Sequence, residues 1–520
     1  MSERSERAGV TVSAAQTPAT TSSDPTVRVP RAPVSRRDTS ATGRADRPDP
    51  CADPPTVTID PTRVMPAVPG PGDLAGDPVA ATVPRLRSVT PAGGGALGDG
   101  RVLAAASALG AAGSFAAWLL AARTLPPDRL GAAVAVVAVV AVAACVARPD
   151  RGAALVARLP AAGRRVGRVV VRSLATAVAL GAAVGGVLAV LVPGPAATLT
   201  ALLPEPAGST WGSPWPGVLL VAAATAAWAA GAVFDGVVVA LDRPWWATAH
   251  IAVLVAGRIA LIAAAGALLG EAVADTGGAG AGWLAAAWLA PVLLWALPGS
   301  AAVAVLARRR GRRVETAAPP QVLGPMAVAR LGATLLHQVA PLAVVLGLGP
   351  GPGMVFFVAW QVVTAVDLAA VWVLGRAGGT SRRRLLLSVG PAMAVVAACA
   401  GPLLGVFGPD YAAAADVLRV LLLGAAFRLV VVHELGALEA AGRAWSSARL
   451  HLYTTVPTLL VIGLAVAAVA TTGLSGVPSA VAGTVLLPVA AGYALVQVAC
   501  CVAVLVPFPT WSRTRPEEQP

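Results

Sequence analysis

Long runs of apolar residues dominate the chain from Arg101 onward, and short polar segments separate them. A helix needs roughly 20 apolar residues to cross a hydrocarbon core of about 30 Å. Twelve runs come near that length: 102–122, 131–147, 172–193, 217–241, 247–269, 282–306, 324–347, 354–375, 385–407, 415–439, 450–471 and 480–507. The pattern predicts an all-α polytopic membrane protein with about twelve transmembrane helices. Eleven or thirteen spans stay open as alternatives, because the second run is short and the last contains Pro488.

Arginines alternate along this series of spans. They cluster after the second, fourth, sixth, eighth, tenth and twelfth runs, whereas the intervening loops hold few, such as Arg123 and Arg129. Loops rich in Arg or Lys stay on the cytoplasmic side of a membrane. The alternation therefore predicts an even number of spans in a multi-pass plasma (inner) membrane protein with both termini in the cytoplasm.

Composition and charge agree with this picture. The chain is 56% hydrophobic and only 12% charged, and its mean hydropathy is +0.73. The net charge of +13 raises the question of nucleic acid. However, the arginines sit in short runs between apolar stretches, so we expect membrane lipids and no nucleic acid as partners. The five cysteines show no metal-ligand spacing, and we expect no metal, no cofactor and no disulfide framework.

Two polar segments divide the chain into regions. Residues 1–97 are rich in Pro, Thr, Ser, Asp and Arg without hydrophobic periodicity, which predicts a disordered cytoplasmic tail or a partner-binding arm. The basic linker 308–323 separates an N-terminal six-helix bundle (98–307) from a C-terminal one (324–507), and a short cytoplasmic tail (508–520) follows. The two bundles begin with similar small-residue helices, which favours a repeat related by an axis along the membrane normal.

Charged residues inside the spans are functional candidates, since each costs about 2.5–3.5 kcal/mol to insert. From about 1.5 Å of helix per residue, Arg330 and Asp367 lie at similar depths, roughly 9 and 12 Å, and adjacent spans can pair them. Asp235 and Arg258 match less well in depth, at roughly 9 and 16 Å. The other intramembrane candidates are Arg428, His433, Glu434 and His337.

Two interpretations of these charges are open. In the first, Arg330 and Asp367 form a neutral buried pair that fixes helix packing. In the second, Arg258, Arg330 and Arg428 line a central cavity, together with Asp367 and Asp235, and the guanidinium groups bind phosphate oxygens bidentately. His337 is a candidate proton relay or a histidine satisfied by packing.

The sequence carries no catalytic constellation. It contains no Walker motif, no His-Glu-x-x-His and no nucleophile elbow. The longest expected outer loop, 194–216, holds a single acid, Glu205. We therefore expect neither an enzyme nor an ATP-driven pump.

Two stretches resemble the polysaccharide and lipid-linked oligosaccharide flippases. The sequence "WLLAARTLPPDRLGAAVAVVAVVAVAA" (118–144) is similar to the first two spans of that family, with a turn from Leu125 to Gly131. The sequence "LLGVFGPDYAAAADVLRVLLLGAAFRLVVVHELGALEAAGRAW" (403–445) is similar to its ninth-to-tenth span region. There a Phe-Gly-x-x-Tyr loop precedes a Leu-rich helix that closes on Gly442 and Arg443.

The resemblance covers most of residues 100–507 and implies the fold of the multidrug/oligosaccharidyl-lipid/polysaccharide flippase superfamily, with two six-helix bundles around a central cavity. It implies a polyprenyl-linked saccharide as cargo for cell-envelope polysaccharide biosynthesis, and glycan-assembly partners for the tail. One alternative is a multidrug exporter of the same superfamily coupled to H⁺ or Na⁺. The other is a non-transporting membrane scaffold.

Overall fold

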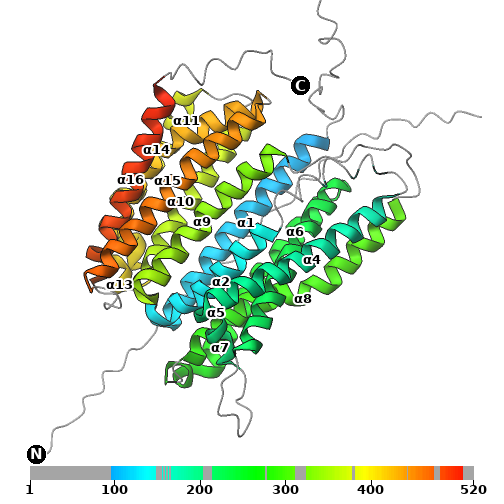
Figure 1. The fold of residues 1–520 in the computed structure, drawn as a ribbon, viewed down its shortest axis with the longest axis horizontal. Coiled ribbons are helices and arrows are strands. Elements are labelled where there is room, and N and C mark those ends of the chain that lie inside the picture. Colours follow the sequence, from blue (N-terminus) through cyan, green and yellow to red (C-terminus); the bar gives the residue numbers. More distant parts are fainter. Residues whose placement is uncertain are drawn as a thin grey trace, which may run out of the picture. The chain divides into compact units, whose positions relative to one another are not determined.

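The computed structural model describes residues 95–147, 165–202, 214–275, 278–310, 324–376, 381–441, 443–473 and 481–506, together with residues 155, 159 and 162. Most of the expected tail 1–97, most of the linker 308–323 and the C-terminal segment 508–520 lie outside these residues, and α1 begins within the last three residues of the expected tail. Within them, all regular secondary structure is helical (Figure 1). The chain is an all-α polytopic membrane protein, as its hydrophobic pattern predicts.

The helices follow the predicted runs closely. They are α1 (Gly95–Thr124), α2 (Pro127–Ala147), α4 (Val166–Leu191), α5 (Pro193–Thr200), α6 (Trp215–Ala240), α7 (Trp245–Asp275), α8 (Gly278–Arg310), α9 (Pro325–Leu348), α10 (Pro350–Arg376), α11 (Arg382–Ala398), α12 (Ala400–Gly405), α13 (Pro409–Ala412), α14 (Ala415–Ala440), α15 (Ala444–Thr471) and α16 (Ala482–Leu505).

Ten of these helices are long and apolar enough to cross a membrane, counted over the described residues. The expected spans 385–407 and 415–439 differ from the rest. The first is divided at Cys399 into α11 and α12, before the Gly401-Pro402 pair. The second is the continuous helix α14, which carries Asp416, Arg419, Arg428, Glu434 and Glu439. The broken helix and the charge density set this part of the second half apart.

The expected outer loop 194–216 contains a short helix that hydropathy does not predict. Pro193 begins α5, consistent with the preference of proline for a first helical turn. The Gly217 backbone N–H donates to the Thr200 hydroxyl at 3.1 Å, and a Cβ at Gly217 would overlap the Ala196 carbonyl. Close backbone approach at this glycine therefore holds α5 against α6.

Helix pairings in the first half recur in the second. Helix α1 packs against α7 as α9 packs against α15, and α6 packs against α8 as α14 packs against α16. The pairs α4–α6 and α7–α8 likewise have counterparts in α11–α14 and α15–α16. Helices α2 and α10, the second long helix of each half, pack directly against each other.

The two ends of the bundle differ in how the halves meet. We call the end holding Arg165, Arg308 and Arg382 the Arg-rich end, and the end with the α1–α2 and α9–α10 turns the opposite end. The largest apolar core contains residues of both halves, such as Val134 and Met354. At the Arg-rich end, one core is built from first-half residues and another from second-half residues. The halves therefore share a core elsewhere but pack separately there.

Close contacts join the halves at the opposite end. A Cβ added at Gly131 on α2 would overlap the Pro350 carbonyl, and one at Gly351 would overlap the Asp128 carboxylate. The Arg123 guanidinium donates to the Val406 carbonyl at 2.7 Å. The two sequence stretches that resemble flippases thus contact each other here.

Candidate functional site

A buried ion pair lies inside the second half. The Arg428 guanidinium on α14 donates to Asp367 Oδ2 on α10 at 2.6 Å, and only 4% and 6% of these residues is exposed. Separating one member from the other would leave an uncompensated charge away from water. This pair therefore ties α10 to α14 in the membrane interior.

His337 on α9 joins the pair through its imidazole. Its Nε2 lies 3.4 Å from Asp367 Oδ2, and its Nδ1 lies 3.3 Å from the Thr364 hydroxyl. The Thr364 hydroxyl in turn donates to the Trp360 carbonyl at 3.0 Å. The roles of the two imidazole nitrogens depend on the tautomer, because a neutral imidazole donates from one nitrogen and accepts at the other. This arrangement places an imidazole beside the buried ion pair.

Pro341 explains how α9 presents His337. Proline lacks an N–H, so the carbonyl four residues earlier, that of His337, loses its helical donor. The Trp360 indole N–H donates to this carbonyl at 3.2 Å. Trp360 of α10 thereby satisfies the carbonyl that Pro341 leaves without a donor. Trp360 also accepts the Thr364 hydroxyl, so it positions both the His337 backbone and, through Thr364, the His337 ring.

Several polar atoms around the pair have no hydrogen-bond partner within the described part of the chain. They are Asp367 Oδ1, the Nη1 of Arg428, the Tyr493 hydroxyl and Oε1 of Gln497. Tyr493 and Gln497 on α16 are fully buried, and the Gln497 amide N–H donates to Thr458 at 2.9 Å. Buried polar groups normally find partners. This interior therefore has spare capacity for water, a proton or a small ion.

The first half holds a buried arginine of another kind. Arg258 on α7 is 7% exposed, and its guanidinium carbon lies 4.7 Å from the Trp288 ring centroid and 5.7 Å from that of Trp228. Its Nε–H donates to the Trp288 carbonyl at 3.3 Å. Aromatic faces attract a cation through their quadrupole. Arg258 is thus held without a carboxylate contact in the described structure.

Asp235 on α6 pairs with a histidine that the sequence analysis does not single out. The His250 Nδ1 lies 2.8 Å from Asp235 Oδ1, while 35% of the Asp235 side chain is exposed. The His250 ring also stacks on Trp295 with centroids 5.2 Å apart. This contact reaches the surface of the helices, unlike the Asp367 pair.

Aromatic rings connect the two halves between these sites. Trp118 on α1 stacks on Trp288 at 4.2 Å and meets Phe357 on α10 edge-on at 5.2 Å. On the same helix, Trp360 contacts Tyr493 edge-on at 5.1 Å. One set of ring contacts therefore runs from Trp288, beside Arg258, to Phe357, and a second set on the same helix α10 joins Trp360 to Tyr493.

The structure brings some of the predicted residues together and separates others. Asp367, Arg428 and His337 form one cluster, whereas Arg258 and Asp235 sit apart in the first half. The side chain of Arg330 lies outside the described residues, and so does the Arg330–Asp367 pairing expected from depth. The described partners of Asp367 are instead Arg428 and His337. The described partner of Asp235 is His250, and that of Arg258 is Trp288.

Sequence reasoning missed Trp288, Tyr493, Gln497 and His250. Tyr493 and Gln497 are four residues apart, and such spacing puts two polar side chains on one helix face inside an apolar run. That spacing was the available signal. Nothing in the sequence of α8 marks Trp288 over the other tryptophans as a cation partner.

Comparison with protein-family models and with curated proteins gives no match. Similar solved structures include an inward-facing multidrug resistance MATE family transporter of the MOP superfamily (TM-score 0.46, 13% identity, covering 77% of this chain and 95% of that one). A MATE structure in the straight conformation has a TM-score of 0.44 and 13% identity, and the match covers 81% of this chain and 97% of that one. A MOP superfamily transporter from Pyrococcus furiosus has a TM-score of 0.42 and 13% identity, and the match covers 80% of this chain and 96% of that one. The similarity covers the helical part and is low in sequence, so it identifies neither a cargo nor a driving ion.

Proposed function

We propose that this chain is a secondary transporter that moves its cargo by alternating access, with a protonatable coupling site at Asp367, His337 and Arg428. The observation that carries the proposal is the buried ion pair with an adjoining imidazole and unpartnered polar atoms. Buried ionisable groups in spans are expensive to maintain, and they mark proton or ion pathways.

The coupling follows from the charges of the cluster. Protonation of Asp367 removes the counter-charge of Arg428 and frees its guanidinium to bind another anion. Because these side chains come from α9, α10 and α14, the change alters the balance of forces among three helices. The shared core and the separate cores at the Arg-rich end fit a state closed at the opposite end.

The first candidate cargo is a lipid-linked saccharide, as the two flippase-like stretches imply. Its pyrophosphate would replace Asp367 at the Arg428 guanidinium once that carboxylate is protonated. Arg258 is less suited to phosphate in this state, since its guanidinium is enclosed by tryptophan faces. Binding of a lipid-linked saccharide would therefore depend on Arg428 more than on Arg258.

A multidrug exporter coupled to H⁺ or Na⁺ is the second candidate. Asp367 Oδ1 supports it, because an unpartnered buried carboxylate oxygen suits a cation or a cationic ligand. In this case Arg428 would serve only to hold Asp367 ionised.

The test is transport by the purified full chain in proteoliposomes, with a fluorescent polyprenyl-pyrophosphate saccharide and with a cationic dye as cargo. We expect Asp367→Asn to abolish proton-driven transport. The matched control is Asp416→Asn, which removes an acid from an exposed pair with Arg419 on α14 and should transport normally. Proton-driven transport that is unchanged by Asp367→Asn would contradict the coupling site.

Complementation of a flippase-null strain separates the cargo classes and the scaffold alternative. Restoration of surface glycan by the wild type, and its loss with Arg428→Ala or Arg330→Ala, would support the saccharide. Dye transport without restoration would favour the exporter. A chain that transports neither cargo, yet loses partner recruitment when residues 1–97 are deleted, would be a scaffold.

The Arg-rich end is proposed to face the cytoplasm, in line with the distribution of positive loops. In a Cys399→Ala background, we expect an impermeant thiol reagent to label Thr472→Cys at the opposite end in intact cells. Trp445→Cys at the Arg-rich end should react only after the membrane is opened. Both positions are exposed.

A further inference from the structure

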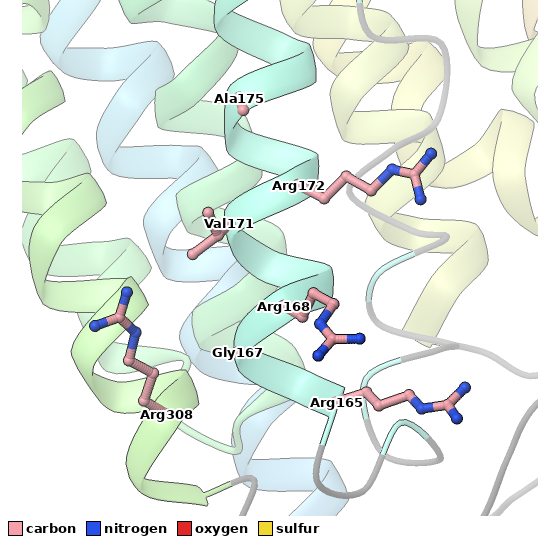
Figure 2. Close-up of a pocket in the computed structure, with 7 residues that line it drawn as sticks. All are labelled: Arg165, Gly167, Arg168, Val171, Arg172, Ala175 and Arg308. Atoms are coloured by element: carbon pink, nitrogen blue, oxygen red, sulfur yellow. The ribbon is translucent and has the colours of Figure 1, made fainter.

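A basic groove lies on the outside of the first half at the Arg-rich end. Its volume is about 490 Å³, and α4 and the last turns of α8 form it (Figure 2). Four arginines, Arg165, Arg168, Arg172 and Arg308, line it with no acid among the lining residues. Such a density of positive charge calls for an anion.

The geometry places these charges around an apolar floor. Figure 2 shows Arg165, Arg168 and Arg172 extending from one side of α4, while Arg308 stands on α8 across from them. Gly167 allows this approach, because a Cβ there would lie only 3.1 Å from Arg308 Cγ. Val171 and Ala175 form the surface between the arginines.

The four guanidinium groups are exposed, and no carboxylate contacts them within the described residues. Like charges on successive turns of one helix repel one another, and a bound anion would relieve that repulsion. Arginine also binds phosphate oxygens through two parallel hydrogen bonds. A phosphate group fits this site better than a carboxylate, because its additional oxygens can engage several guanidinium groups.

The surroundings indicate that the anion belongs to a lipid. Helix α4 packs on α2, α5, α6 and α8 through its other face, and exposed apolar side chains continue from the groove along the span. Val171 and Val178, seven residues apart on one side of α4, form this stripe and are 41% and 42% exposed. Free phosphate would make no use of this stripe, whereas an acyl chain would cover it.

We propose that this groove binds the headgroup of an anionic membrane phospholipid, whose phosphate contacts the arginines and whose acyl chain lies along the exposed stripe of α4. The site is separate from the Asp367 cluster, which lies in the other half of the chain. It also holds for either orientation of the protein, since both leaflets of a membrane present headgroups at the ends of spans. The ligand is a resident lipid, and transport of it is not implied.

The test titrates the detergent-solubilised full chain with phosphatidylglycerol or phosphatidylcholine and counts bound lipids by native mass spectrometry. We expect the wild type to prefer phosphatidylglycerol. The Arg168→Gln/Arg172→Gln variant should bind phosphatidylglycerol about 30-fold more weakly, the equivalent of about 2 kcal/mol for two arginines near a headgroup. Binding of phosphatidylcholine should not change.

The matched control removes two exposed arginines elsewhere at the same end, Arg383→Gln/Arg384→Gln at the start of α11. It should keep the preference of the wild type. An equal loss in both variants would mean that net charge, not this groove, attracts the lipid. Inorganic phosphate that displaces phosphatidylglycerol at millimolar concentration would overturn the lipid assignment, because the stripe would then contribute nothing.

Wild-type protein that shows no preference between the two lipids would also overturn the proposal. Thermal unfolding checks the fold of both variants, which should melt at the temperature of the wild type without lipid. An added Val178→Asn variant, which introduces no charge, tests the stripe. It should weaken binding of phosphatidylglycerol and leave any phosphate binding unchanged.

Discussion

Arg258 and Arg428 are both buried arginines in membrane-spanning helices, and the two halves of the chain stabilise them by different means. Tryptophan faces and a backbone carbonyl surround Arg258. Arg428 faces a carboxylate that also contacts a histidine. The described contacts of the first arginine include no carboxylate or imidazole, while the second arginine has one of each beside it. In the terms of the proposed function, the first is a fixed charge and the second an adjustable one.

The largest effect is expected from breaking the adjustable site. Arg428→Met leaves the Asp367 carboxylate buried and uncompensated, which should lower the free energy of unfolding by about 3–5 kcal/mol. Thermal unfolding in detergent measures this loss. The Arg428→Met/Asp367→Asn double variant should recover much of it, because no buried charge remains. A double variant as unstable as the single one would show that packing, and not the ion pair, dominates.

A smaller loss is expected at the fixed site. Arg258→Met removes a cation–π contact of about 2 kcal/mol but leaves no opposite charge behind. The same unfolding measurement should therefore give a lower cost than Arg428→Met. Arg258→Lys retains a cation over the rings and serves as the control. If Arg258→Met cost as much as Arg428→Met, an unrecognised counter-charge would be present.

The third effect is expected at the half-exposed pair. Asp235→Asn should cost about 1 kcal/mol or less, since water screens a carboxylate with a 35% exposed side chain. His250 keeps its stacking on Trp295 in this variant. Unfolding at low and at high salt separates the two contributions, because only the ionic part depends on salt.

The smallest effect is expected at the exposed Asp416–Arg419 pair of α14. Asp416→Asn should leave the unfolding temperature unchanged within error, although its ion pair is as short as that of Arg428, 2.6 Å in both cases. Exposure, not distance, sets the difference. A clear loss of stability here would undermine the use of burial to rank all four sites.

Hydropathy predicted most of the long helices, because the membrane imposes length and polarity on every span. It failed where local backbone chemistry decides. The break at Cys399 follows from Gly401 and Pro402. Helix α5 depends on its close contact with Gly217 of α6. An apolar run carries no information on either feature.

The members of the candidate cluster can be picked out from the sequence, but their contacts cannot. Asp367, Arg428 and His337 stand out as ionisable residues inside spans. Depth along the membrane normal, however, says nothing of which helices are neighbours in the plane. Depth matched Asp367 with Arg330, whose side chain lies outside the described residues, and gave no sign that α10 packs against α14 as well as α9, which brings Arg428 to Asp367. The lateral packing of the helices, which depth does not describe, decides this contact.

The hydrogen bond from the Trp360 indole to the His337 carbonyl restricts how α9 and α10 can move relative to each other. Pro341 leaves that carbonyl without a helical donor, and a donor on α10 bonds it instead. Sliding α9 past α10 would uncover the carbonyl in an apolar interior, at the cost of a lost hydrogen bond. The two helices should therefore move as a single rigid lever. Any rearrangement of this half would then place its joints at the ends of that lever, beside the glycine-rich turn at Gly349 and the Arg-rich end of α10.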